Sequence, residues 1–305
     1  MVKQGLADFD LYPYNPSAVP GWLFVVLFAI GTVVHLALAI RYRSWFFIPF
    51  LLGCLAETGG YYGRAWSHNN RRLGSPYLLQ LFLILIATPL FSATIYKTLS
   101  RLSRSLTAGK RRMRWTSALY IILDIACLVL QVIGTVMEAY GSGSDKKNSS
   151  KYVACGLILQ LLAFLLFMLL AWRLQRRVSA DPTFVSAHPR APRWRRRFAM
   201  LYVASMLVLV RNLVRVVEFV QGGDGEILQH ETYLYVFDAR PMFLLVVVVA
   251  VLHPGRVVRF ARKLEKETGS VAEGTTAETS GRNLLAEEFK SEDGEAREMG
   301  CVGHT

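Results

Sequence analysis

Apolar residues lie along this chain in long blocks, which short charged stretches separate. The apolar core of a bilayer requires about 20 mostly apolar residues per helix, and seven blocks reach or approach that length. This pattern predicts an all-α, polytopic membrane protein with seven transmembrane helices. The predicted spans cover residues 22–40, 45–64, 77–96, 116–138, 152–172, 198–220 and 233–252.

The seventh block differs from the others in its length. Its purely apolar run extends only from Met242 to Leu252, which is too short to cross a bilayer as a helix. A seventh span must therefore include Asp238 and Arg240 at or near membrane depth.

Lysine and arginine are distributed unevenly between alternate loops. The loops on one side of the predicted membrane carry 21 of these residues, and those on the other side carry six. Because cytoplasmic loops are enriched in Lys and Arg, we expect the N-terminus outside and the C-terminus in the cytoplasm. The expected domains are an extracytoplasmic segment (1–21), a seven-helix transmembrane domain (22–252), and a cytoplasmic basic segment with a disordered acidic tail (253–305). Asn148 begins an Asn-Ser-Ser glycosylation acceptor in a loop that this topology places outside.

Composition narrows the class of protein further. Hydrophobic residues make up 53% of the chain, charged residues 19%, and the mean hydropathy is +0.32, values that argue against an ordinary soluble enzyme. A net charge of +13 would suit a nucleic-acid binder, but the basic residues lie between the apolar blocks, where membrane orientation explains them. We therefore expect no nucleic-acid partner. The four scattered cysteines favour neither a disulfide framework nor a zinc site.

Several ionisable and polar residues lie inside the predicted spans. A charge at the bilayer centre costs about 2.5–3.5 kcal/mol on insertion scales, so such residues are candidates for a functional site. They recur at i, i+4 and i+7 or at sevenfold spacing, which places each set on one helical face. The candidates for a substrate-binding polar network are Glu57, Tyr61, Arg64, Asp124, Gln131, Arg211, Arg215, Glu218 and Asp238.

The loop between the sixth and seventh spans has about a dozen residues, which makes these spans antiparallel neighbours. We therefore expect Asp238 to pair with Arg211 or Arg215. Two compatible interpretations of the polar residues stay open. They form a structural salt-bridge network, or they line a polar, partly hydrated outer cavity that receives the charged end of an amphiphilic molecule.

Signatures of catalysis are largely missing. The spans offer only His35 and His253 as histidine ligands, whereas a zinc site needs about three converging side chains. The sequence contains no H-E-x-x-H, no G-x-S-x-G and no Gly-rich phosphate loop. We expect neither an enzyme nor a bound cofactor.

Several multi-residue motifs follow one another in a fixed order. They are ETGGYYGR at 57–64, the stretch 124–131 with Gly134, RNLVRVVE at 211–218, His230-Glu231 followed by YVFDARPM at 235–242, and HPG at 253–255. Together they resemble the fungal lipid-translocating exporter family, the seven-span group named for aminocholesterol resistance. The resemblance covers roughly residues 12–260, and its ordered motifs make it far more specific than a single short pattern.

The resemblance implies a fungal membrane protein, at the plasma membrane or an internal membrane. It also implies export or flipping of lipids such as sphingoid long-chain bases, with resistance to toxic amphiphiles. Members of the family are associated with other hydrophobic molecules as well, porphyrins among them, so the resemblance does not identify the substrate. The family has no nucleotide-binding domain, so transport would be passive or driven by a gradient.

The leading hypothesis is a translocator of amphiphilic lipids. Glu57, Glu218 and Asp238 would recognise a cationic head group, with Arg64, Arg211 and Arg215 as their resting partners. Its partners would be membrane lipids or amphiphilic small molecules. The main alternative is a seven-transmembrane lipid sensor or receptor, whose basic loops and acidic tail contact signalling proteins and which moves no lipid.

Overall fold

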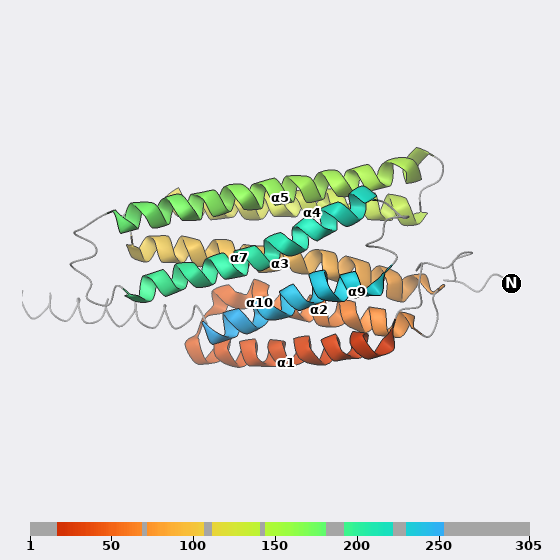
Figure 1. The fold of residues 1–305 in the computed structure, drawn as a ribbon, viewed down its shortest axis with the longest axis horizontal. Helices are drawn as coiled ribbons and strands as arrows, with labels where there is room; N and C mark the ends of the chain where they lie inside the picture. Colours follow the sequence, from red (N-terminus) through yellow and green to blue (C-terminus); the bar gives the residue numbers. More distant parts are fainter. Residues whose placement is uncertain are drawn as a thin grey trace, which may run out of the picture. The chain divides into compact units, whose positions relative to one another are not determined.

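The structure is a computed structural model, and it describes residues 17–68, 72–106, 112–140, 144–180, 192–221 and 230–252 (Figure 1). Within these ranges every regular element is helical, which confirms the all-α class for the described part of the chain. The elements are α1 (Ala18–Tyr42), η1 (Trp45–Phe47), α2 (Ile48–Ser67), α3 (Gly74–Leu106), α4 (Arg112–Tyr140), α5 (Ser144–Ser179), α7 (Pro192–Gln221), α9 (Glu231–Leu234), η2 (Tyr235–Ala239) and α10 (Arg240–Val251). Most of the expected N-terminal segment and the whole expected tail lie outside the described residues.

Six helical segments of the described chain are long and apolar enough to cross a membrane. They cover Ala18–Tyr42, Gly74–Ser103, Trp115–Met137, Asn148–Ser179, Arg196–Gln221 and Glu231–Val251. The last of these is the block that appeared shortest from its apolar run, and it qualifies because its helix begins at Glu231.

Helix α2 covers the second predicted block but is not among the six. Its 20 residues include Glu57, Arg64 and four glycines, and these residues lower its hydropathy. All seven predicted blocks are therefore helical, while length and composition support six of them as membrane spans.

Neighbouring helices in the sequence pack side by side. Helix α2 contacts α1 and α3, α4 contacts α3 and α5, α7 contacts α3, α5 and α10, and α1 contacts α10 (Figure 1). Successive helices run in opposite directions (Figure 1). The end of the bundle at which α1 begins, here called the amino-terminal end, therefore also holds the end of α2, the start of α3 and the start of α9.

The outward faces of the helices are apolar. In α1, Val26, Ile30 and Val33 are exposed, while Phe24 and Phe28 on the other face are buried. Large apolar side chains are likewise exposed along α5. A helix that is apolar all round suits lipid rather than water, so these surfaces fit a bundle embedded in a bilayer.

Close backbone contacts fix two pairs of helices. A Cβ at Gly63 would lie 2.9 Å from the carbonyl oxygen of Pro76 and 3.0 Å from the backbone nitrogen of Gln80. A Cβ at Gly134 would lie 2.8 Å from the carbonyl oxygen of Ser149. Small residues allow this close approach between membrane helices, so α2 packs tightly on α3, and α4 on α5.

The π-helical turn η2 lies between α9 and α10. Pro241 follows it closely, and in a regular α-helix a proline lacks the backbone donor and clashes with the carbonyl four residues earlier. A π turn is wider than an α turn and occurs frequently at functional sites. In this turn Asp238 is buried, whereas the nearby Arg240 is exposed.

The position of Asn148 differs from the expected loop. The residue lies within α5, which begins at Ser144, because Ser and Asp are favoured at the start of a helix and extend it beyond the apolar block. The Asn148 side chain is exposed, and its Oδ1 accepts a hydrogen bond of 3.2 Å from Lys151 Nζ. Use of this glycosylation acceptor stays a prediction.

Candidate functional site

Arg211 is the centre of a buried cluster of charges. Its side chain is 1% exposed, and it lies on α7 where α2, α3 and η2 meet. Its Nη1 donates to Glu57 of α2, and its Nε lies 2.6 Å from Asp238 Oδ1 of η2. Its Nη2 donates to the carbonyl oxygen of Ile84 on α3 at 3.0 Å. One guanidinium therefore ties three other elements to α7.

Arg215, one turn further along α7, extends this cluster. Its Nη2 donates to Asp238 Oδ2 at 3.1 Å, and its Nη1 lies 3.3 Å from Glu218 Oε2. The expected pairing of Asp238 with Arg211 or Arg215 is thus confirmed, and it involves both arginines. We call Glu57, Arg211, Arg215, Glu218 and Asp238 the central network.

The central network holds more negative than positive formal charge. Three carboxylates face two guanidinium groups, which leaves one negative charge uncompensated within the network. Among the described residues, Glu57 Oε2 is buried without a hydrogen-bond partner, and so is the hydroxyl of Tyr61. A buried charge is costly unless it is paired or neutralised by a proton, so the network can take up one further positive charge, as a proton or as a bound cation.

Aromatic rings from three elements line the side of this site that faces α1. The Tyr61 ring stacks on Phe28 at 5.7 Å and lies 5.4 Å from Phe24, and Phe24 stacks on Tyr235 of η2 at 5.6 Å. Aromatic faces attract cations, including alkylammonium groups. Tyr61, which the sequence placed on one face with Glu57, is therefore positioned beside the network as an aromatic wall rather than as an ion-pair partner.

Arg64 belongs to a second cluster, nearer the amino-terminal end. Its Nη2 forms an ion pair of 2.9 Å with Glu231 Oε1, and its Nε donates to the Tyr235 hydroxyl at 2.9 Å. Glu231 also accepts hydrogen bonds from the Ser17 backbone nitrogen at 2.8 Å and from Ser17 Oγ at 2.7 Å. We call these four residues the Arg64–Glu231 cluster, which joins α1, α2 and the start of the last span.

Three members of this cluster were missed as site residues in the sequence. Glu231 occurs in a quoted motif but precedes the predicted span 233–252, Tyr235 lies near the start of that span, and Ser17 precedes the first span. The sequence feature that could have indicated this cluster is Glu231, a carboxylate just outside the seventh apolar block and at the same end of the bundle as Arg64.

Asp124 and Gln131 lie apart from both clusters. They are buried on α4, which packs against α3 and α5. Gln131 Nε2 donates to Gln160 Oε1 of α5 at 2.8 Å. The structure thus brings five of the nine candidates into the central network, places Tyr61 beside it and Arg64 in the neighbouring cluster, and leaves two on a different interface.

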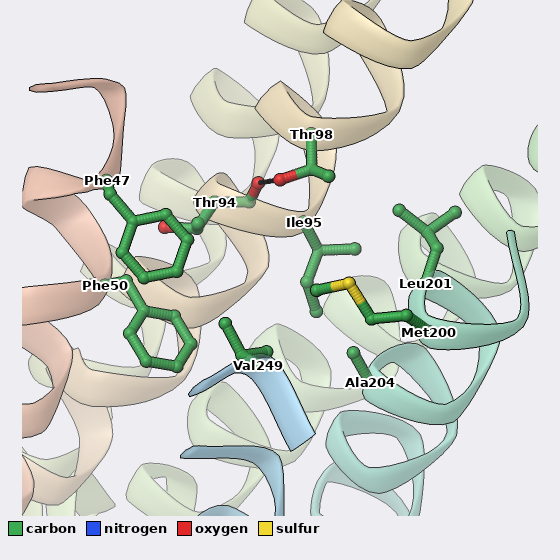
Figure 2. A pocket seen from close by; sticks show the side chains of 9 residues that line it. All are labelled: Phe47, Phe50, Thr94, Ile95, Thr98, Met200, Leu201, Ala204 and Val249. Carbon is green, nitrogen blue, oxygen red and sulfur yellow. Dashed lines mark hydrogen bonds between the residues drawn. The ribbon is translucent and has the colours of Figure 1, made fainter. Parts of the chain in front are cut away.

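A narrow apolar pocket lies on the side of the central network that is away from the amino-terminal end. Figure 2 shows the side chains that line it. It is formed by η1 and α2, α3, α7 and α10, which are the elements that carry the central network or adjoin it. Its cavity volume is only about 10 Å³, which is about the space that one water molecule needs. Its lining residues are Phe47, Phe50, Thr94, Ile95, Thr98, Met200, Leu201, Ala204 and Val249.

The pocket and the central network share two helices. Phe50 precedes Glu57 by seven residues on α2, and Ala204 precedes Arg211 by seven residues on α7. Seven residues of α-helix correspond to about 10 Å. The hydroxyl of Thr98 in the pocket is occupied, because it donates to the Thr94 carbonyl oxygen at 2.7 Å (Figure 2). An apolar space therefore lies roughly two helical turns beyond the charges.

A set of lipid-facing helices around a buried network of ion pairs defines an integral, multi-pass membrane protein. Within the described ranges, no three His, Cys, Asp or Glu side chains are arranged to hold a metal ion.

The chain belongs to the RTA1-like protein family, whose model matches residues 50–261. It is 33% identical to Protein RTA1 of Saccharomyces cerevisiae over 282 residues, which cover 83% of this chain and 87% of that protein. It is 32% identical over 284 residues to Protoporphyrin uptake protein 1 of the same species, with 80% and 92% of the two chains covered. No solved structure matches the chain.

A further relative is named as the transporter of a lipid. The chain is 25% identical over 268 residues to Sphingoid long-chain base transporter RSB1 of Saccharomyces cerevisiae, with 76% of this chain and 70% of that protein covered. Together these matches confirm the resemblance to the fungal lipid-translocating exporter family.

Proposed function

We propose that this protein is a membrane translocator of cationic amphiphilic lipids, of the sphingoid long-chain base type. The observation that carries the proposal is the excess carboxylate of the central network, together with the unpartnered Glu57 Oε2. A primary ammonium supplies three donors and one positive charge. It would complete the charge balance of the network and lie against the Tyr61 ring.

The apolar pocket gives the proposal a place for the lipid tail. A head group at Glu57 and a tail directed toward Phe50 would span the distance of about 10 Å between the two features. The pocket has little room for water in this conformation. We infer that entry of a tail requires α7 and α10 to move away from α2 and α3.

The names of the relatives support transport and agree less well on the substrate. One relative is named as a sphingoid long-chain base transporter and another as a protoporphyrin uptake protein. Both names describe movement of amphiphiles rather than catalysis, and we propose that this chain is likewise not an enzyme. We further propose that it acts at the plasma membrane and confers resistance to toxic amphiphiles.

We also propose that α2 crosses the membrane as a seventh span. Helix α2 lies between α1 and α3 and ends at Ser67 beside Arg64, at the same end of the bundle as the start of α9. Seven crossings put the N-terminus and the C-terminus on opposite sides, and the distribution of Lys and Arg then favours an external N-terminus.

Cysteine labelling tests this orientation. In a protein whose native cysteines are replaced by serine, Thr232→Cys and Ser179→Cys introduce thiols at exposed positions near opposite ends of the bundle. A membrane-impermeant maleimide should label Thr232→Cys on intact cells, and should label Ser179→Cys only after the cells are permeabilised. The reverse pattern, or labelling of both in intact cells, would refute the proposed topology.

Reconstitution tests the function itself. Purified full-length protein in liposomes should accelerate the transbilayer movement of a fluorescent sphingoid base severalfold over empty liposomes and over liposomes with heat-inactivated protein. Saturable binding of the same lipid without any movement would contradict translocation and would instead support a lipid sensor.

A further inference from the structure

A second buried polar site lies between α3, α4 and α5, away from the central network. Asp124 on α4 is 2% exposed, and among the described residues its side-chain oxygens interact with no polar group other than the Tyr96 hydroxyl of α3. The residue lies close to the middle of the candidate span Trp115–Met137. Nothing in the proposed head-group site uses this carboxyl.

The surroundings of Asp124 are aromatic and carry no positive charge. Its polar neighbour is the Tyr96 hydroxyl of α3, whose ring lies 4.5 Å from Phe167 of α5 and 5.5 Å from Tyr120 of α4. The titratable groups that face this region are Tyr96 from α3, Tyr120 and Cys127 from α4, and Cys155 from α5. Within the described ranges no lysine, arginine or histidine interacts with the carboxyl.

Other buried polar atoms lie along the same helices. In the described part of the chain the Tyr96 hydroxyl of α3 interacts with Ser92 and Asp124, whereas Gln160 Nε2 of α5 has no hydrogen-bond partner. Buried polar groups are normally paired, so these side chains extend the polar surroundings of Asp124 along α3 and α5.

The buried face of α4 carries a row of polar side chains. Ser117 and Gln131 lie seven residues before and after Asp124, on the same face of the helix. Ser117 Oγ donates to the Tyr96 carbonyl oxygen at 3.1 Å, and Gln131 pairs with Gln160. From Ser117 to Gln131 the helix rises about 21 Å, which is most of the thickness of a bilayer core.

We propose that Asp124, with Tyr96 beside it, is a proton-binding site through which a proton gradient drives substrate movement. An ionised carboxylate without a cation is strongly disfavoured in an apolar interior, so the described conformation holds Asp124 as the neutral acid. Proton uptake forms one O–H bond on an Asp124 oxygen with a proton carried by water, and release returns that proton to water on the other side. The coupling part of this proposal rests on the proposed transport function, whereas proton binding does not.

Infrared difference spectroscopy tests proton binding directly. Full-length protein in lipid is titrated with acid and base, and the carbonyl stretch of a protonated carboxylic acid is followed. This band should titrate in the wild type, lose one component in Asp124→Asn, and shift in frequency in Tyr96→Phe. Identical titration spectra for the wild type and Asp124→Asn would overturn the proposal.

Proteoliposomes with a pH difference across the membrane test the coupling. One pH unit supports up to about a tenfold accumulation for one proton moved per substrate, and empty liposomes under the same gradient correct for spontaneous trapping of the base. The ratio of accumulation with and without the gradient should fall to about one in Asp124→Asn and recover in part in Asp124→Glu.

The outcomes separate this proposal from the proposed function. Proton coupling is overturned if movement of the base in the wild type is independent of the gradient. It is also overturned if the gradient changes movement equally in the wild type and in Asp124→Asn. Either result leaves translocation intact. Absence of any movement in the wild type overturns translocation and coupling together, while the infrared titration still decides whether Asp124 binds a proton.

Discussion

Replacing Arg211 with methionine should strongly destabilise the folded protein. The guanidinium compensates Glu57 and Asp238 and also binds the Ile84 carbonyl oxygen. Removing one partner of a buried ion pair costs about 3–5 kcal/mol, because it leaves a buried charge uncompensated. Thermal unfolding of the purified protein in detergent should show this loss as a large decrease in the midpoint temperature.

Two further variants separate loss of the ion pair from loss of the side chain. Arg240→Met removes an exposed arginine close to the same network and should change stability by no more than about 0.5 kcal/mol. The Arg211→Met change leaves Glu57 and Asp238 without this partner. Combining it with Glu57→Gln removes the charge of Glu57, while Asp238 keeps its contact with Arg215. The double variant should therefore be more stable than Arg211→Met alone. Equal destabilisation by Arg211→Met and Arg240→Met would contradict the central role of Arg211.

Replacing Glu57 with glutamine should abolish protection against a toxic sphingoid base while leaving the protein folded. The amide oxygen of glutamine can still accept the Arg211 hydrogen bond, and Asp238 still compensates Arg211. The change removes the uncompensated negative charge and the free carboxylate oxygen. A hydrogen bond to a charged group contributes about 1.5–3 kcal/mol, so affinity for the base should fall by roughly 10- to 100-fold.

Growth of yeast cells on increasing concentrations of the base measures this effect, with protein abundance followed in membrane fractions. Glu231→Gln is the matched control, because it makes the same chemical change in the Arg64–Glu231 cluster, where Arg64, Tyr235 and Ser17 already surround the carboxylate. Normal resistance in Glu57→Gln cells at normal abundance would show that Glu57 does not bind the head group.

Much of the fold follows from hydropathy, and the exceptions follow from polar residues. Each of the seven apolar blocks is a helix. The second block carries Glu57, Arg64 and four glycines, so its hydropathy does not mark it as a span. It is tightly packed on α3 through Gly63, which shows that contacts with other helices, rather than apolarity alone, position it in the bundle.

The candidate site was predictable where helical spacing determined it. Spacing along one face grouped Arg211, Arg215 and Glu218, and the short loop before the last span brought Asp238 to them. Spacing could not identify Glu231 as the partner of Arg64, because that pairing depends on how the helices are rotated about their axes. The rotation of the last span depends on the π turn before Pro241, which no periodicity indicates.

Asp124 also shows that helical spacing predicts which residues share a face but not which helices that face contacts. Its sevenfold spacing to Gln131 correctly placed both residues on one face of α4. Which neighbours that face meets depends on the packing of α4 against α3 and α5, where Gly134 and Gly156 allow close approach. Depth along the spans already separated Asp124 from the other candidate charges, and the structure places it on a different helix interface.

The central claim, that the excess carboxylate of the central network selects a cationic head group, is tested most directly by a matched pair of lipids. In wild-type proteoliposomes, a fluorescent sphingoid base is compared with its neutral N-acetyl amide, which has the same chain and fluorophore. The account predicts that protein-dependent movement of the base is faster by about 10-fold or more, as expected from the loss of one charged hydrogen bond. Equal protein-dependent rates for the two lipids would contradict it.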